Sequence, residues 1–190
     1  FLGSSEVSVK EMVGAFSIYA NKGVYNAPMM VTKIEDKYGN VLANFYPESR
    51  EVITENTAFL MANLLQGVVD EGTGRRLRFR YGFKNQIGKT GTTQNHSDGW
   101  FIGITPDLAG GVWVGAEDRS IHFQNLANGQ GASMALPIWA LFMQKVYADK
   151  SLAVPQSDFQ KPNGVNHVLD CGDADREGMT DYDSSDEIFD

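Results

Sequence analysis

Two apolar runs joined by a Pro-Asp pair limit most strongly how this 190-residue chain can fold. Residues 100–105 and 108–115 are apolar, and Pro106 presets the backbone for a tight turn between them. Together they predict two antiparallel strands. Residues 86–93 predict a third strand just upstream, and consecutive strands this close usually pair with each other. We therefore expect a three-stranded antiparallel meander.

Helical patterns flank this sheet on both sides. Apolar residues at helical spacing predict three helices, at residues 8–21, 54–70 and 133–147. Ser8 with Glu11 makes a capping box at the start of the first helix, and Thr54 is the expected N-cap of the second. Residues 30–35 and 41–46 predict a small β-hairpin between these two helices. The expected class is α+β, an antiparallel sheet with packed helices.

The formal charge of −8 is unevenly distributed. Acidic and basic residues cancel over residues 1–150, whereas residues 151–190 contain ten acids against Lys161 and Arg176. A neutral body beside an acidic tail argues against a nucleic-acid partner. We predict one folded portion at residues 1–149 and an acidic, flexible tail at 150–190, because low hydrophobicity with high net charge disfavours packing.

The sequence contains no pattern that requires a cofactor or a metal. His96, His122 and His167 lie at no metal-ligand spacing, and no flavin or nicotinamide signature occurs. No run of 18 apolar residues is present. The chain begins at Phe1 instead of Met, which favours a fragment or a processed chain.

Residues 86–93 combine one lysine with several hydroxyls and two glycines. In an ideal strand Lys89 and Gly91 point to one face, and Thr90 and Thr92 point to the other. A ligand lying along the strand edge would contact the backbone, with the side chains of Lys89, Thr90 and Thr92 around it, and Gly91 would allow it to come close. This set suits an extended peptide that ends in a carboxylate.

Two other interpretations concern the same region. A phosphate-binding loop ending in Lys89-Thr90 needs glycine at position 83, which is Phe83, and it should open a helix where a strand is predicted. That interpretation is rejected. Five basic residues precede the strand, and they form either a solvated loop or a source of positive potential for an anionic substrate. They are Arg75, Arg76, Arg78, Arg80 and Lys84.

From residue 3 to about residue 147 the chain resembles the C-terminal half of the transpeptidase domain of bifunctional, class A penicillin-binding proteins. Lys-Thr-Gly is a known motif of this superfamily, together with Ser-x-x-Lys and Ser-x-Asn-type motifs. Several ordered blocks carry the resemblance in addition to that tripeptide. They are residues 2–7, 20–25, 67–74, 89–93, 99–103, 105–108, 111–115 and 135–139.

The resemblance implies acyl transfer from D-Ala-D-Ala stem peptides of peptidoglycan through a serine, and trapping of that serine by β-lactams. It implies that Lys89 supplies positive charge, that Thr90 and Thr92 bind the substrate carboxylate, and that the backbone N–H of Thr92 is an oxyanion donor. The parent protein would also carry a glycosyltransferase domain and a membrane anchor, on the periplasmic side of the inner membrane.

The chain departs from the family pattern in one respect. No serine starts a Ser-x-x-Lys motif, including Ser8 and Ser133, and no Ser-x-Asn occurs. Residues 19–21 imitate a Tyr-x-Asn variant but end a helix. The nucleophile and its base lysine are therefore expected before Phe1, in the upstream half of the same domain. The alternatives are a non-catalytic binding or scaffold relative, and a D,D-carboxypeptidase or β-lactamase.

Overall fold

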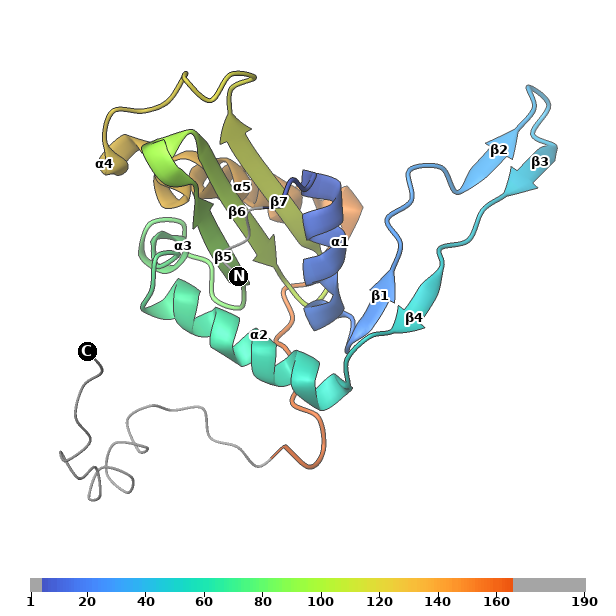
Figure 1. Cartoon of the computed structure of the whole chain (residues 1–190). Coiled ribbons are helices and arrows are strands. Elements are labelled where there is room, and N and C mark those ends of the chain that lie inside the picture. The colour runs from blue at the N-terminus through green and yellow to red at the C-terminus, as the bar shows by residue number, and fades with distance from the viewer. Residues whose placement is uncertain (1–4, 166–190) are drawn as a thin grey trace, which may run out of the picture.

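A computed structural model describes residues 5–165 (Figure 1). Helix, hairpin, helix, three strands and a long helix follow one another in the predicted order, which confirms the α+β class. The elements are α1 (Val9–Ala20), β1 (Val24–Asn26), β2 (Lys33–Glu35), β3 (Val41–Asn44), β4 (Ser49–Glu51), α2 (Glu55–Asp70), α3 (Arg76–Phe79), β5 (Ile87–Thr92), η1 (Gln94–His96), β6 (Asp98–Ile104), β7 (Ala109–Gly115), α4 (Leu126–Gly129), α5 (Gly131–Ala148) and η2 (Lys150–Leu152).

The predicted three-stranded meander is present as the sheet β5-β6-β7. Both strand pairs are antiparallel, with Thr90 opposite Phe101 and Trp100 opposite Trp113. The turn between β6 and β7 is held by the hydroxyl of Thr105, which accepts hydrogen bonds from the backbone N–H groups of Asp107 and Leu108. The predicted Pro-Asp turn is thus confirmed.

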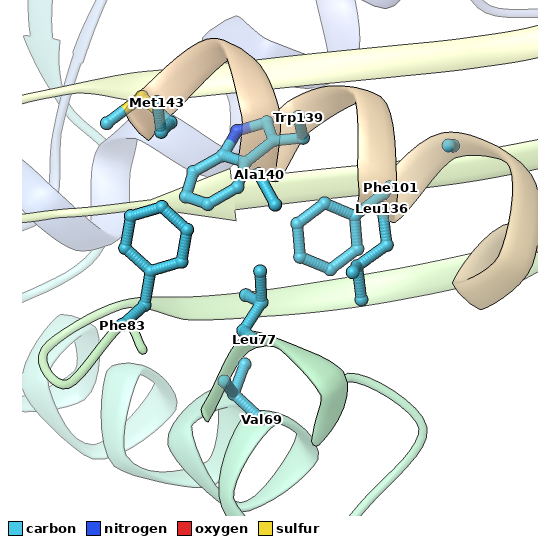
Figure 2. Packing of buried hydrophobic residues seen from close by; sticks show 9 residues of the cluster. Val69, Leu77, Phe83, Phe101, Leu136, Trp139, Ala140 and Met143 are labelled. Carbon is cyan, nitrogen blue, oxygen red and sulfur yellow. The ribbon is translucent and has the colours of Figure 1, made fainter. Parts of the chain in front are cut away.

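Helices cover both faces of this sheet (Figure 1). Helix α5 packs on one face, where Trp139 meets Phe101 edge-on at 5.5 Å between ring centroids. The same aromatic cluster receives Leu77 from α3 and Phe83 from the following loop (Figure 2). On the other face, Ile102 and Ile104 pack with residues of α1 and α2. The sheet therefore has two apolar cores, as expected for helices packed on both sides.

Close packing of α5 depends on glycines in the sheet. A Cβ atom on Gly103 would lie 2.4 Å from Cε2 of Trp139, and one on Gly110 would lie 2.9 Å from its Nε1. The indole therefore occupies space that the side chain of any larger residue at these two positions would fill.

The predicted helix starts are confirmed by their caps. The Ser8 hydroxyl accepts from the backbone N–H of Glu11, whose carboxylate accepts from the backbone N–H of Ser8. The Thr54 hydroxyl accepts from the backbone N–H of Thr57 at the start of α2. Helix α5 begins at Gly131, two residues before the expected start.

A two-part β arm extends away from the body between α1 and α2 (Figure 1). Strands β2 and β3 form the predicted hairpin, although each is shorter than expected. Strands β1 and β4 were not predicted. They pair at the base of the arm, with Val24 opposite Glu51, and each has only three residues, too few for an alternating pattern to be visible.

Part of the predicted tail contacts the body. The Ser157 hydroxyl donates to the carboxylate of Asp107, Phe159 packs on the α1–α2 core, and Val165 is buried. Most other residues between 151 and 165 are exposed. The boundary at residue 150 remains a prediction, and residues 166–190 lie outside the described part. Within residues 5–165, no helix is long and apolar enough to cross a membrane.

Candidate active site

Strand β5 has one edge without a strand partner in the described residues, because only β6 pairs with it. The backbone N–H of Thr93 donates to the carbonyl of Asp98 at 3.1 Å, which marks a hydrogen-bonded pair at the end of the ladder. Hydrogen-bonded and non-hydrogen-bonded pairs alternate in an antiparallel ladder. Thr90 and Thr92 are therefore in non-hydrogen-bonded pairs. Their backbone N–H and C=O groups face the open edge.

Lys89 is exposed beside this edge. Its Nζ atom donates to the carbonyl oxygen of Thr90 at 2.7 Å, so the side chain bends around to the edge instead of extending into solvent. A lysine held by one neutral carbonyl keeps two further N–H donors. The arrangement places a cation with spare donors next to the backbone groups of Thr90.

The hydroxyls of the two threonines lie on the face of β5 that α5 covers, each with a partner. Oγ1 of Thr90 is 2.6 Å from Oγ1 of Thr73, which lies in the turn between α2 and α3. Oγ1 of Thr92 accepts a hydrogen bond of 3.0 Å from the backbone N–H of Gly131, the first residue of α5. Because Thr92 uses a lone pair in this bond, its own hydroxyl proton stays available to a ligand.

Gly91 lies between these residues, opposite Trp100. A Cβ atom at this position would come within 3.1 Å of Cβ of Trp100, which is tighter than ordinary packing. The contact with Trp100 therefore favours glycine here, in addition to the close approach of a ligand that the sequence suggested. The four predicted site residues lie together on one strand, as expected.

Asp98 anchors the turn that follows β5. Its carboxylate accepts from the hydroxyl of Thr93 at 2.7 Å, from the hydroxyl of Ser97 at 3.2 Å and from Nε1 of Trp113 at 3.0 Å. Partial burial raises the pKa of Asp98, but the hydrogen bonds from Thr93, Trp113 and Ser97, with the nearby Arg119, outweigh it and hold the pKa below its usual value.

Two members of the basic run have structural roles. Nη1 of Arg76 donates to the carbonyl of Ala132 at 3.2 Å, joining α3 to the start of α5. Arg78 pairs with Asp70 and donates to the carbonyl of Gln86 at 3.1 Å. These two arginines therefore hold the segment before β5 in place, which neither interpretation of the run from sequence had specified.

The candidate site includes residues that the sequence did not single out. Thr73 and Gly131 contact β5, and Asp98 contacts Thr93 directly after the strand. The nearest signal for Thr73 was its position between two glycines that end a helix. No group of three His, Cys, Asp or Glu side chains suited to a metal occurs within residues 5–165.

Comparison with known proteins identifies relatives of this chain. The family model described as "Penicillin binding protein transpeptidase domain" matches residues 2–132. Penicillin-binding protein 1A of Aquifex aeolicus is 34% identical over 161 residues, which is 85% of this chain and 21% of that protein. The chain thus spans about a fifth of the length of the curated relatives that it matches.

Solved structures show the same fold. The crystal structure of penicillin-binding protein 1A from Haemophilus influenzae superimposes with a TM-score of 0.73 at 22% identity, over 84% of this chain and 28% of that chain. The imipenem acyl-enzyme complex of penicillin-binding protein A from M. tuberculosis gives 0.57 at 16% identity, over 73% and 31%.

Proposed function

Because this chain belongs to the penicillin-binding protein transpeptidase family, we propose that it forms one wall of a peptidoglycan D,D-transpeptidase active site in a longer protein. The substrate would be a stem peptide ending in D-Ala-D-Ala. The nucleophilic serine and its base lysine would come from sequence outside these 190 residues, which contain no Ser-x-x-Lys motif.

The proposed reaction has two acyl-transfer steps. The serine oxygen attacks the carbonyl carbon of the penultimate D-alanine, the C–N bond breaks, and the serine proton passes through the base to the departing amine of D-alanine. An amine of a neighbouring stem peptide then attacks the acyl-enzyme ester. A new amide forms, and the serine takes back a proton.

Each residue of the β5 site has a role in this proposal. The hydroxyls of Thr90 and Thr92 bind the terminal carboxylate, and Lys89 supplies positive charge beside it. Gly91 lets the peptide approach the strand. The backbone N–H of Thr92 donates to the oxyanion. A well-placed donor of this kind lowers the activation barrier by about 3 kcal/mol.

The open edge of β5 is the observation that carries this proposal. An extended peptide can add to an unpaired edge through backbone hydrogen bonds. The N–H and C=O groups of Thr90 and Thr92 face that edge, and the exposed Lys89 lies beside them. The backbone groups that would bind the peptide and the lysine that would bind its carboxylate therefore lie together at one end of β5.

We further propose that β-lactams acylate the same site, because they present a carboxylate and a reactive amide in similar positions. The imipenem acyl-enzyme complex of the M. tuberculosis relative is consistent with this. The parent protein would carry a glycosyltransferase domain as well. Its transmembrane anchor would hold the transpeptidase region on the periplasmic side of the inner membrane.

Labelling with fluorescent penicillin tests the function. The folded full-length protein that contains this chain should become covalently labelled, and excess unlabelled benzylpenicillin should prevent the labelling. No label on the folded protein would contradict the transpeptidase proposal and favour a non-catalytic scaffold. Labelling followed by rapid release of penicilloate, with hydrolysis of stem peptides instead of cross-linking, would favour a carboxypeptidase or β-lactamase.

The isolated 190-residue chain provides a control. Since it lacks the serine motif, it should show no penicilloyl mass increase in intact mass spectrometry. An adduct on this chain would contradict the proposed division of the active site between two portions of sequence.

A further inference from the structure

The hydroxyl pair of Thr73 and Thr90 links the β5 site to a turn that lies outside the Lys-Thr-Gly motif. The two oxygens are 2.6 Å apart. Thr73 is exposed and Thr90 is half-buried. They are 17 positions apart in the sequence. Thr73 makes this contact from the turn between α2 and α3, which is not part of the sheet.

The backbone that holds Thr73 is firmly fixed. The N–H groups of Glu71 and Gly72 both donate to the carbonyl of Gly67, and the N–H of Gly74 donates to the carbonyl of Val68 at 2.9 Å. A Cβ atom on Gly72 would lie 2.9 Å from the backbone of Val68, so only glycine fits there. The turn can shift only if these contacts break.

Buried side chains on either side of the turn anchor it further. Val69 at the end of α2 and Leu77 in α3 are both fully buried in the α5-side core (Figure 2). The position of Thr73 is therefore set by the core of the protein. Its hydroxyl is presented to β5 from a rigid support, in contrast to a side chain on a mobile surface loop.

The two hydroxyls together can donate one further hydrogen bond to a ligand. Two hydroxyls that share one hydrogen bond leave one hydroxyl proton free, whichever oxygen is the donor. When Thr73 donates to Thr90, the free proton belongs to Thr90 and is polarised by the first bond. Thr92 offers a second free proton, because its oxygen accepts from Gly131.

We propose that Thr73 is a positioning residue that orients the hydroxyl of Thr90 toward the carboxylate of the peptide or β-lactam. The inference rests on the proposed function and extends it to a residue outside the motif. Thr73 acts through Thr90 and does not take part in covalent chemistry. Its effect should therefore depend on whether the ligand carries a negative charge.

Variants of the full-length protein test this dependence. Thr73→Val removes the hydroxyl at nearly constant volume, and Thr73→Ser retains it. Thr32→Val is the matched control, since Thr32 is an exposed threonine within the β arm, where its carbonyl accepts from the backbone N–H of Phe45. Acylation rate constants are measured by competition with fluorescent penicillin, using benzylpenicillin and its methyl ester.

The expected result is a selective loss. Thr73→Val should acylate about three- to tenfold more slowly with benzylpenicillin, the range for one net hydrogen bond. Its rate with the uncharged methyl ester should change less than twofold. Thr73→Ser and Thr32→Val should resemble the wild type with both compounds. The acid-to-ester rate ratio is the readout that a purely structural role would not change.

Other results would overturn the inference. If the acylation rate falls equally with the acid and the ester, Thr73 only supports the turn. If it falls with neither compound, the hydroxyl of Thr90 does not need Thr73 for its orientation. If thermal unfolding shows that Thr73→Val is misfolded, Thr73→Ala replaces it under the same criteria. A wild-type protein that is never acylated would instead remove the proposed function, and the inference would fall with it.

Discussion

The backbone N–H of Gly131 donates to the hydroxyl of Thr92, with 3.0 Å between nitrogen and oxygen. This bond joins the first residue of α5 to the last residue of β5. The first N–H groups of a helix have no intrahelical partner, so Thr92 supplies one. The same contact uses one lone pair of the hydroxyl oxygen and leaves the hydroxyl proton free for an anion.

Thr92→Val should therefore affect both stability and acylation. We expect a loss of about 1 kcal/mol in the free energy of unfolding, because a hydrogen bond at the helix start is removed. Acylation by benzylpenicillin should fall about tenfold or more. Thr92→Ser should retain most of both. Thermal unfolding and fluorescent-penicillin labelling measure the two effects, and a Thr92→Val protein that matches the wild type in both would rule out this dual role.

Lys89→Gln should reduce acylation with little effect on folding. The expected loss is about ten- to a hundredfold, the size typical for a hydrogen bond to a charged group. The free energy of unfolding should change by no more than about 0.5 kcal/mol, since the side chain is exposed. Lys10→Gln, at an exposed position on α1, is the charge-matched control. Comparable rates for the two variants would argue against a role for Lys89.

Two glycine variants should have opposite effects on stability. Gly103→Ala would bring a Cβ atom within 2.4 Å of Trp139 and should destabilise the protein by about 1–3 kcal/mol. Gly67→Ala lies in α2 with no atom near the added methyl, and should stabilise it by about 0.5–1 kcal/mol. Chemical denaturation measures both. Equal denaturation midpoints for the two variants would show that Trp139 does not pack against Gly103 as described.

Asp98→Asn should destabilise the protein in a pH-dependent way. A depressed pKa means that the carboxylate contributes stability above its ordinary pKa of about 3.9, and this stability is lost as the pH falls through the lower pKa of the folded state. We expect the Asp98→Asn variant to lose about 1–2 kcal/mol at pH 7 through weakened hydrogen bonds. The difference from wild type should shrink below about pH 4.

Melting temperatures between pH 3 and pH 7 test this expectation. Glu117→Gln, at a nearby exposed position, serves as the control for the loss of one negative charge. A gap between Asp98→Asn and wild type that stays constant over this range would show that the charge of Asp98 does not contribute.

Much of the fold follows from patterns that are local in the sequence. The apolar runs on either side of Pro106 predicted β6 and β7, and Ser8 and Thr54 predicted the starts of α1 and α2. Caps, turns and side-chain periodicity depend on residues a few positions apart. Strands β1 and β4 escaped prediction because their three-residue pairing joins positions more than 20 residues apart.

The candidate site divides in the same way. The sequence alone determined that Lys89, Gly91 and the two threonines share one strand, with alternating side chains. Only the tertiary structure decided that Thr73 would meet Thr90 and that Gly131 would meet Thr92, 39 positions away. These contacts require the packing of α2, α3 and α5 around one core. Pairings of that range are set by the burial of apolar side chains, which no short stretch of sequence displays.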